Sequence, residues 1–179
     1  FSSKDFEADT VLSLANADLA GADLQAQIFW GRDFSGTNLS HANLNRAILR
    51  EACLYGARLQ FTTLQGADLR GADLRRVDLH TADLRQAYYA RGTRFPAGFD
   101  PDGAGLYGVL PSAQLIGANL RQLDISGAEL TASDLSGACL VEGRGLGSWL
   151  VNVNFSRADL SQANLSYARL DGARLDQAS

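Results

Sequence analysis

The chain has 179 residues, of which 46% are apolar and 20% charged, and its 16 Lys and Arg against 20 Asp and Glu give a formal net charge of −4. This balance excludes a disordered chain, a basic nucleic-acid face and an acidic tail. No apolar run approaches the roughly 18 residues that a membrane span requires, no signal peptide is visible, and two cysteines cannot build a disulfide framework.

Leucine and alanine, with 28 and 27 copies, recur in a register of five. Starting from Leu14, every fifth residue to Tyr89 is large and apolar, and a second series runs from Leu110 to Leu175. Of these 30 positions, which we call centres, only Gly145 is not apolar, and they hold 24 of the 28 leucines. A helix requires a period of 3.6, so steps of five would spread the leucines around its circumference. The Ala/Leu-rich composition therefore does not indicate helices.

Small and polar residues keep fixed places around each centre. Alanine stands two residues before it in 18 of the 30 repeats, Asp or Asn often stands one before, and Gly often stands two after. We expect each pentapeptide to form one side of a square coil, with Gly in a type II turn at the corner and Asp bonded to nearby backbone. Four sides make a coil of 20 residues, and successive coils stack like parallel strands.

Tandem Ala-Asp-Leu-X-Gly, as at Ala17–Gly21 and Ala67–Gly71, resembles the pentapeptide repeat family, in particular its Leu-centred cyanobacterial and plastid branch. The resemblance implies an all-β fold, a right-handed quadrilateral parallel β-helix. Thirty repeats at four per coil predict about seven to eight coils, interrupted by one inserted loop. We expect a single solenoid domain over 1–179, whose parts are an N-terminal cap (1–11), a first repeat stack (12–91), the inserted loop (92–107) and a second repeat stack (108–178).

The segment 92–107 departs from the pattern because it holds two of the three prolines and four glycines, and the register shifts by one across it. One interpretation is a loop that docks a partner through Phe95 and Phe99. The other is a loop that folds back on its own stack, with both phenylalanines packed against a face. The second interpretation is favoured.

A further irregularity spans Gln27 to Arg32, where Gln27 and Arg32 occupy inward positions that are normally small. Either this corner is distorted or Arg32 turns outward to pair with Asp33, because a buried unpaired Arg would be very costly. Trp30 faces outward, and Arg50 and Arg70 follow at 20-residue steps in the same column. The column is suited to cation–π packing or an interface anchor, although a solvated arginine ladder beside Glu51 is favoured.

The glycine cluster Gly143–Gly147 interrupts the register, since Gly145 leaves one slot without its centre. We expect a bulge or a flattened side here. It is not a dinucleotide fingerprint, because no helix follows on which a phosphate could rest.

No constellation predicts catalysis or metal binding. His41 and His80 lie on different sides of different coils, and Cys53 and Cys139 are many coils apart, so no metal site, disulfide or Cys–His pair is expected. No carboxylate pair stands out for acid–base work. We therefore expect neither an enzyme nor a cofactor.

The sequence favours a structural or protein-interaction module with a protein partner and no direct nucleic-acid binding. The alternative, a DNA mimic acting on a type II topoisomerase such as gyrase, needs a strongly negative surface. Self-association through the C-terminal coil is a further expectation, because no C-terminal cap is visible. The cytoplasm is favoured as compartment, with periplasm or thylakoid lumen also allowed. The candidate interaction surface comprises Trp30, Arg32, Arg50, Arg70, Phe95, Phe99, Tyr107 and Trp149.

Overall fold

Backbone pairing in the computed structural model, which describes residues 13–179, repeats every twenty residues. Asp18 is bridged to Asn38 and Asn38 in turn to Arg58, and each of these bridges is parallel. The same spacing recurs later in the chain, where Gln114 is bridged to Asp134. Four five-residue sides therefore make one coil, as the period of the sequence predicts.

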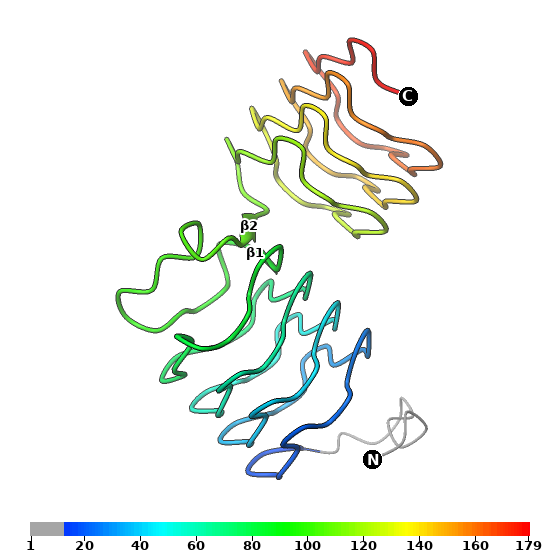
Figure 1. Cartoon of the computed structure of the whole chain (residues 1–179). Coiled ribbons are helices and arrows are strands. Elements are labelled where there is room, and N and C mark those ends of the chain that lie inside the picture. Colours follow the sequence, from blue (N-terminus) through cyan, green and yellow to red (C-terminus); the bar gives the residue numbers. More distant parts are fainter. Residues whose placement is uncertain (1–12) are drawn as a thin grey trace. The chain divides into compact units, whose positions relative to one another are not determined.

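The chain is divided into two units, Phe1–Leu106 and Tyr107–Ser179, and each winds as its own stack of coils (Figure 1). The first unit contains strand β1 (Tyr88–Tyr89), and the second begins with strand β2 (Tyr107–Gly108). The expected N-terminal cap, 1–11, lies outside the described residues.

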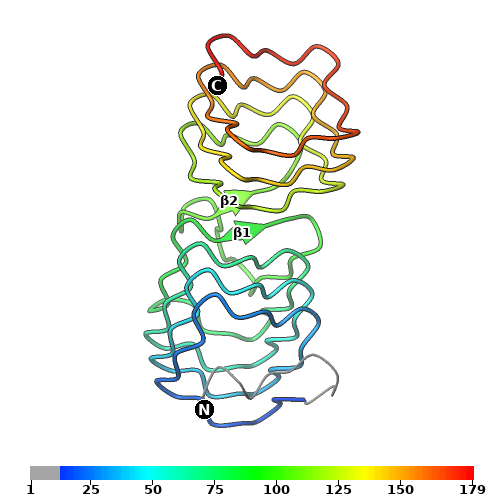
Figure 2. The ribbon, with the colours of Figure 1, turned by 90° about the vertical axis from the view of Figure 1, so that its right-hand side faces the viewer.

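Most sides pair through a single residue instead of a continuous strand. Asp23, for example, is bridged to Asn43, while the residues on either side of it already belong to corners. The pleat alternates every two residues and a side is only five residues long, so each side offers one pairing position before the chain turns. The two stacks seen in Figure 2 are thus ladders of isolated parallel bridges.

The corners resemble type II turns, with exceptions such as the one at Thr81, which is not left-handed. At the first corners the centre carbonyl accepts a hydrogen bond from the amide three residues on, as from Ala22 N to Leu19 O at 3.1 Å. The residue two after the centre is left-handed, with φ of 68° at Gly21, and non-glycine residues adopt the same conformation, such as Ala26 at 56°. The corner geometry is therefore kept whether or not glycine occupies it, at a conformational cost for the other residues.

The centres stack along the axis of each unit, and most are almost completely buried, among them Leu39, Leu59 and Phe155 at 0% exposure. Threonine hydroxyls at the small inward position donate hydrogen bonds to backbone carbonyls. Thr37 Oγ1 donates to Leu14 O at 2.6 Å and Thr62 Oγ1 to Leu39 O at 2.7 Å, each reaching one coil back. Buried polar groups are thereby hydrogen-bonded, which removes the cost of burying them.

Of the two alternatives expected at Gly143–Gly147, a bulge or a flattened side, the bulge is wrong. Arg144 is bridged both to Asp124 and to Asn164 at the regular spacing, so the backbone path is unchanged. A Cβ on Gly145 would stand only 2.7 Å from Leu165 and 3.5 Å from Ile125. The side chains of the neighbouring coils therefore fill the slot that the missing centre leaves.

Among residues 13–179, no helix is long and apolar enough to cross a membrane.

Candidate interaction surface

Trp30 and Arg50 form the centre of an outward face on the first unit. Trp30 follows the centre Phe29 and is 57% exposed, and Arg50 follows Leu49 one coil later. The coil repeat brings the Arg50 guanidinium over the Trp30 ring, with Cζ 5.6 Å from the ring centroid. This is a cation–π contact, and it holds an exposed indole in one orientation.

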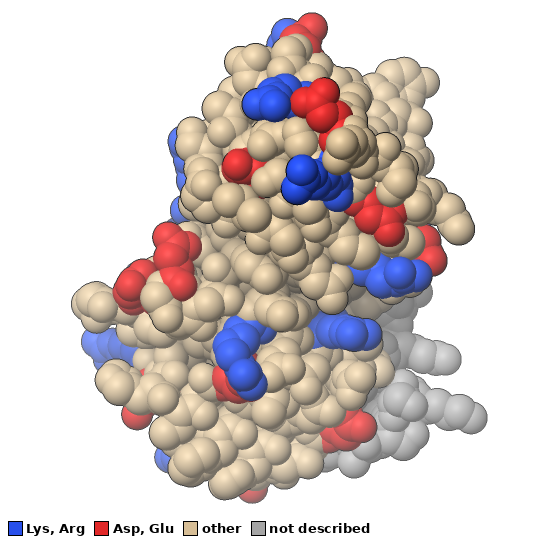
Figure 3. Space-filling model, turned by 45° about the horizontal axis from the view of Figure 1, so that its top comes forward, with Lys and Arg blue, Asp and Glu red and all other residues tan. Residues whose placement is uncertain are grey.

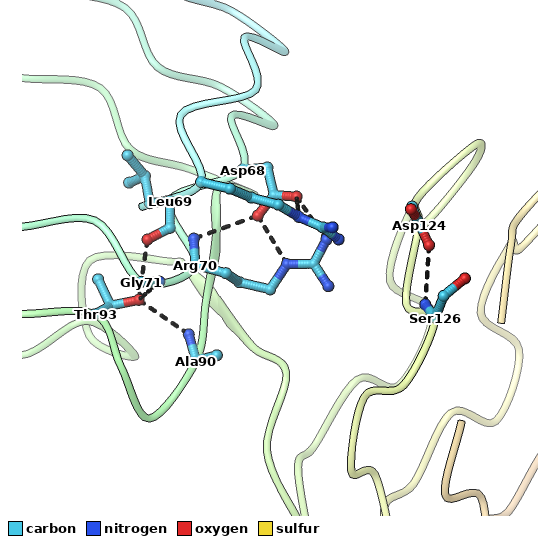
Figure 4. A network of polar contacts seen from close by, with 9 residues as sticks. Asp68, Leu69, Arg70, Gly71, Ala90, Thr93, Asp124 and Ser126 are labelled. Carbon is cyan, nitrogen blue, oxygen red and sulfur yellow. Dashed lines mark hydrogen bonds and ion pairs between the residues drawn. The ribbon is translucent and has the colours of Figure 1, made fainter. Parts of the chain in front are cut away.

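Asp68 binds both arginines of this face. Its Oδ2 accepts from Arg50 Nε at 2.7 Å, and its two oxygens accept from Arg70 Nε at 2.7 Å and Nη2 at 2.5 Å. Figure 4 shows the Asp68–Arg70 pair together with Thr93, whose hydroxyl accepts from Gly71 N and donates to Leu69 O. A bidentate guanidinium–carboxylate pair fixes both side chains geometrically.

The Asp68 carboxylate is ionised in spite of its burial. Burial alone would raise its pKa, but hydrogen bonds and charge from Arg70, and then from Arg50, outweigh that effect and lower the pKa below its ordinary value. The side chains of Arg50 and Arg70 are only 17% and 10% exposed. The expectation of a solvated arginine ladder is therefore wrong, because a buried carboxylate draws both guanidinium groups inward.

Arg32 is half-buried and its corner is regular. Its amide donates to Phe29 O at 3.1 Å, the same turn bond that normal repeats make. The neighbouring Asp33 accepts from Ser35 N at 2.9 Å and from the Ser13 hydroxyl at 3.3 Å. Of the two alternatives that the sequence left open here, the distorted corner is therefore wrong.

The segment after β1 folds back on its own unit. Phe95 meets the Tyr89 ring edge-on, with centroids 5.6 Å apart, and stacks on Phe99 at 5.1 Å. Both phenylalanines are half-buried. Tyr89 also donates from its hydroxyl to Asp102 at 2.7 Å. Burial first, and then this carboxylate, raises the pKa of Tyr89 to about 12. The aromatic cluster thus ties the segment at two points.

Tyr107 and Trp149 belong to the second unit. Tyr107 is half-buried in β2, whereas Trp149 is 47% exposed and carries Arg169 over its ring, with Cζ at 4.7 Å. This second Trp–Arg pair repeats the arrangement of Trp30 and Arg50, again with Arg one coil after Trp. Its arginine pairs with a different kind of carboxylate, since Arg169 contacts the exposed Asp171 at 3.4 Å.

Titratable side chains elsewhere do not gather into a reactive site within the part of the chain that the structure describes. Both Cys53 and Cys139 are free thiols, and no group of three or more metal-ligating side chains occurs among residues 13–179. His80 contacts Asp78 at 3.0 Å through Nδ1, but both side chains are strongly exposed. With so much of both side chains in contact with water, this pair is a polar part of the surface rather than an enclosed general base.

Positive and negative side chains are interspersed over the face seen in Figure 3. Local pairs account for much of this, since Arg75 and Arg85 each bond the aspartate two residues earlier, Asp73 and Asp83. The surface field is therefore mixed, unlike the uniform charge of a duplex.

The sequence pattern did not single out Asp68, because aspartate stands one residue before the centre in many repeats. Asp68 follows Ile48 by 20 residues and stands two before Arg70 and 18 after Arg50. At that spacing it lies between the two arginines of the column. The register of 20 could have identified it.

The pentapeptide repeat model matches the chain in eight copies, over residues 17–54, 52–88, 112–142 and 147–177. The chain belongs to the pentapeptide repeat family. Members of this family form right-handed quadrilateral β-helices and are generally structural modules without enzymatic activity, and no catalytic family is indicated. The comparison with curated proteins gave no match.

Solved structures of the same family are similar to the chain. The pentapeptide repeat protein alr5209 from Nostoc PCC 7120 is 40% identical over 54% of this chain and 84% of its own, with a TM-score of 0.31. HetL from the same cyanobacterium, a protein involved in heterocyst differentiation regulation, is 29% identical over 93% and 82%, with a TM-score of 0.31. A thylakoid-lumen protein of Arabidopsis thaliana, AT2G44920, is 25% identical over 75% and 68%, with a TM-score of 0.35.

Proposed function

We propose that this protein is a non-enzymatic interaction module that binds a protein partner through the face around Trp30. The observation that carries the proposal is the Trp30–Arg50–Asp68 arrangement, in which a buried carboxylate holds an arginine and the arginine orients an exposed indole. Exposed aromatic side chains that are already fixed lose little entropy on binding, and Trp and Arg dominate binding hot spots.

Apolar surface next to the indole supports the same proposal. Ile28, two residues before Trp30, is 67% exposed, and Ile48 is bridged to it from the next coil. An exposed cluster of this kind, bordered by charged groups, is typical of a surface that a partner covers.

The test is quantitative capture of partners by the wild-type protein, by Trp30→Ala and by a matched control, Tyr167→Ser. Tyr167 is 89% exposed in the second unit, so its loss removes a comparable aromatic surface elsewhere. Partner affinity should fall at least about tenfold in Trp30→Ala, the effect of a hot-spot truncation, and stay unchanged in the control.

A spectroscopic measurement locates the contact. The chain has two tryptophans, so Trp149→Phe leaves Trp30 as the single indole reporter. A captured partner should shift the emission of Trp30 in that background. Equal binding by Trp30→Ala and the wild type, or a partner that leaves the emission unaltered, would overturn the proposal.

We make two further proposals about this module. We propose about seven to eight coils by the repeat arithmetic, with 92–107 as an insertion. We also propose self-association through the C-terminal coil, where the centres Leu170 and Leu175 are 36% and 47% exposed. Leu175→Glu should then lower the mass observed in sedimentation, whereas a wild-type monomer at all concentrations contradicts self-association.

A further inference from the structure

One side of a coil in the first unit, residues 77–81, is paired with neither neighbour. Every other one-before-centre residue from Asp18 to Tyr88 takes part in a parallel bridge, but Asp78 takes part in none within the described chain. In the side just before it, Leu54 N donates to Asp73 O and Asp73 N to Ala52 O. The ladder of bridges is thus interrupted at this one side.

The interruption leaves backbone groups of this side without partners. The preceding coil no longer reaches its carbonyls, because Phe61 N donates to the Thr81 hydroxyl at 3.1 Å. The neighbouring side 72–76 shows the hydrogen bonds that a regular side makes with the coil after it. Leu74 N donates to Arg94 O, and Ala72 O accepts from Arg94 N. The corresponding groups, Leu79 N and Val77 O, make no hydrogen bond with any residue of 13–179.

A groove lies along this unpaired side. One wall consists of residues from Arg76 to Leu84, and the other of residues from Pro96 to Ala104. Its volume is about 760 Å3, and both walls belong to the first unit. By the coil register, residues near 98 would lie over Asp78, but the segment bulges away there, as Figure 1 shows for the loop that follows β1.

We infer that this groove binds an extended peptide segment of a partner protein, which adds as a parallel strand to residues 77–81. The unpaired Leu79 N and Val77 O would be the donor and acceptor for it, as in β-strand addition to an exposed sheet edge. The inference extends the proposed interaction function to a second site but does not depend on Trp30.

The walls define the chemistry of the segment. Ala97, Phe99 and Pro96 offer apolar surface, which fits an apolar side chain at the position that a repeat centre would occupy. The charged lining residues, Arg76, Asp78, His80 and Asp100, carry both signs, so recognition rests on the main chain more than on net charge. The other sides from Asp18 to Tyr88 are each paired with a pentapeptide repeat of the same chain, so a segment with the repeat sequence fits the groove.

The probe is therefore a capped ten-residue peptide with the sequence of residues 66–75, Gly-Ala-Asp-Leu-Arg-Gly-Ala-Asp-Leu-Arg. Its binding to the full chain is followed by amide hydrogen exchange and by the shifts of individual amide signals. At saturating peptide, exchange at Leu79 should slow at least about tenfold, as expected when a free amide gains a partner. Regular amides such as Leu54 should be unaffected.

Two controls separate strand addition from adhesion to an apolar surface. The same peptide with both aspartate amides N-methylated keeps its side chains but loses the donors that Val77 O requires, and should bind at least about tenfold more weakly. Ala97→Trp places a large ring in the groove and should abolish binding. Ala20→Trp, an exposed alanine at the far part of the same unit, should not.

Equal binding of the N-methylated peptide, binding undiminished by Ala97→Trp, or a Leu79 amide already protected without peptide would each overturn the inference. Trp30→Ala should bind the peptide as well as the wild type does. If partner capture through Trp30 succeeds while the peptide fails to bind, the groove inference falls and the proposed function stands.

Discussion

Arg50 lies between two partners from different coils, with Cζ 5.6 Å from the Trp30 ring centroid and Nε 2.7 Å from Asp68. One contact is at the surface and the other is largely buried. The orientation of an exposed indole therefore depends on a carboxylate two coils away.

Asp68→Asn should destabilise the protein by about 1–3 kcal/mol, because it leaves two mostly buried guanidinium groups without their counter-charge. Asp171→Asn, which alters the exposed pair with Arg169, should change the unfolding free energy by less than about 0.5 kcal/mol. Denaturant titrations measure both. A cost for Asp68→Asn no larger than that of the control contradicts the structural role assigned here.

The same variant makes a prediction about pH. The pKa of Asp68 is lower in the folded protein than its ordinary value of 3.8, so the unfolded chain binds the proton more readily. Its contribution is present above about pH 4 and is lost as the pH falls through the folded pKa. Between neutral pH and acid, the wild type should lose more stability than Asp68→Asn does. If both proteins lost the same unfolding free energy between neutral and acidic pH, the lowered pKa of Asp68 would be contradicted.

Tyr89 should ionise well above the ordinary tyrosine range, since its pKa is raised to about 12 by burial and by Asp102. Its contribution to stability is present below about pH 10 and is lost as the pH rises toward the folded pKa. Phenolate absorbance should show a late component that Tyr89→Phe removes. Asp102→Asn should move that component to lower pH, and a wild type without any late component would refute the assignment.

Gly21→Ala and Ala26→Gly should act in opposite directions. A Cβ at Gly21 would meet no atom within 4 Å, so the only cost is the left-handed backbone, about 1 kcal/mol. Ala26 already bears that cost at φ 56°, and glycine should recover about 0.5 kcal/mol after the entropy of the unfolded chain is counted. The same sign for both unfolding free energies would refute the corner model.

Gly145→Leu restores the repeat pattern and should nevertheless destabilise the protein by about 1–3 kcal/mol. Leu165 and Ile125 already occupy the slot, so the new side chain overpacks the core. Thermal denaturation compares it with the wild type. A variant that is equally or more stable would show that the slot is empty instead of filled.

DNA gyrase should supercoil normally in the presence of sub-micromolar amounts of this protein. The net charge is −4, and Arg75 and Arg85 neutralise neighbouring aspartates on the surface. Duplex DNA carries about one charge per 1.7 Å, which such a surface does not imitate. Clear inhibition in the supercoiling assay would favour the DNA-mimic alternative.

The five-residue register predicted the corners and the coil repeat, because both follow from local turn chemistry and a fixed count. The position two after each centre is left-handed at Gly21 and at Ala26 alike, so the register matters more than the residue type. At Gly145 the sequence left a bulge or a flattened side open, because it shows a missing side chain but not that Leu165 and Ile125 fill its place.

The candidate surface was predicted only in part. The column of Trp30, Arg50 and Arg70 follows from the spacing, and the structure shows the cation–π contact within it. The role of Asp68 depends on side-chain rotamers that converge across coils, which a linear pattern does not encode. The unpaired side at Asp78 arises from the path of a distant segment, and no residue within 77–81 signals it.

Single-residue pairing also bears on aggregation. An ordinary edge strand presents a long row of free amides and carbonyls, which a second chain can extend into a fibril. Here the row changes direction at a corner after nearly every pentapeptide, and corner amides such as Gly21 N bond the next coil at 2.9 Å, so a coil edge offers no long straight run of pairing positions. A parallel β-solenoid built this way can leave coil edges uncovered with little risk of templating amyloid.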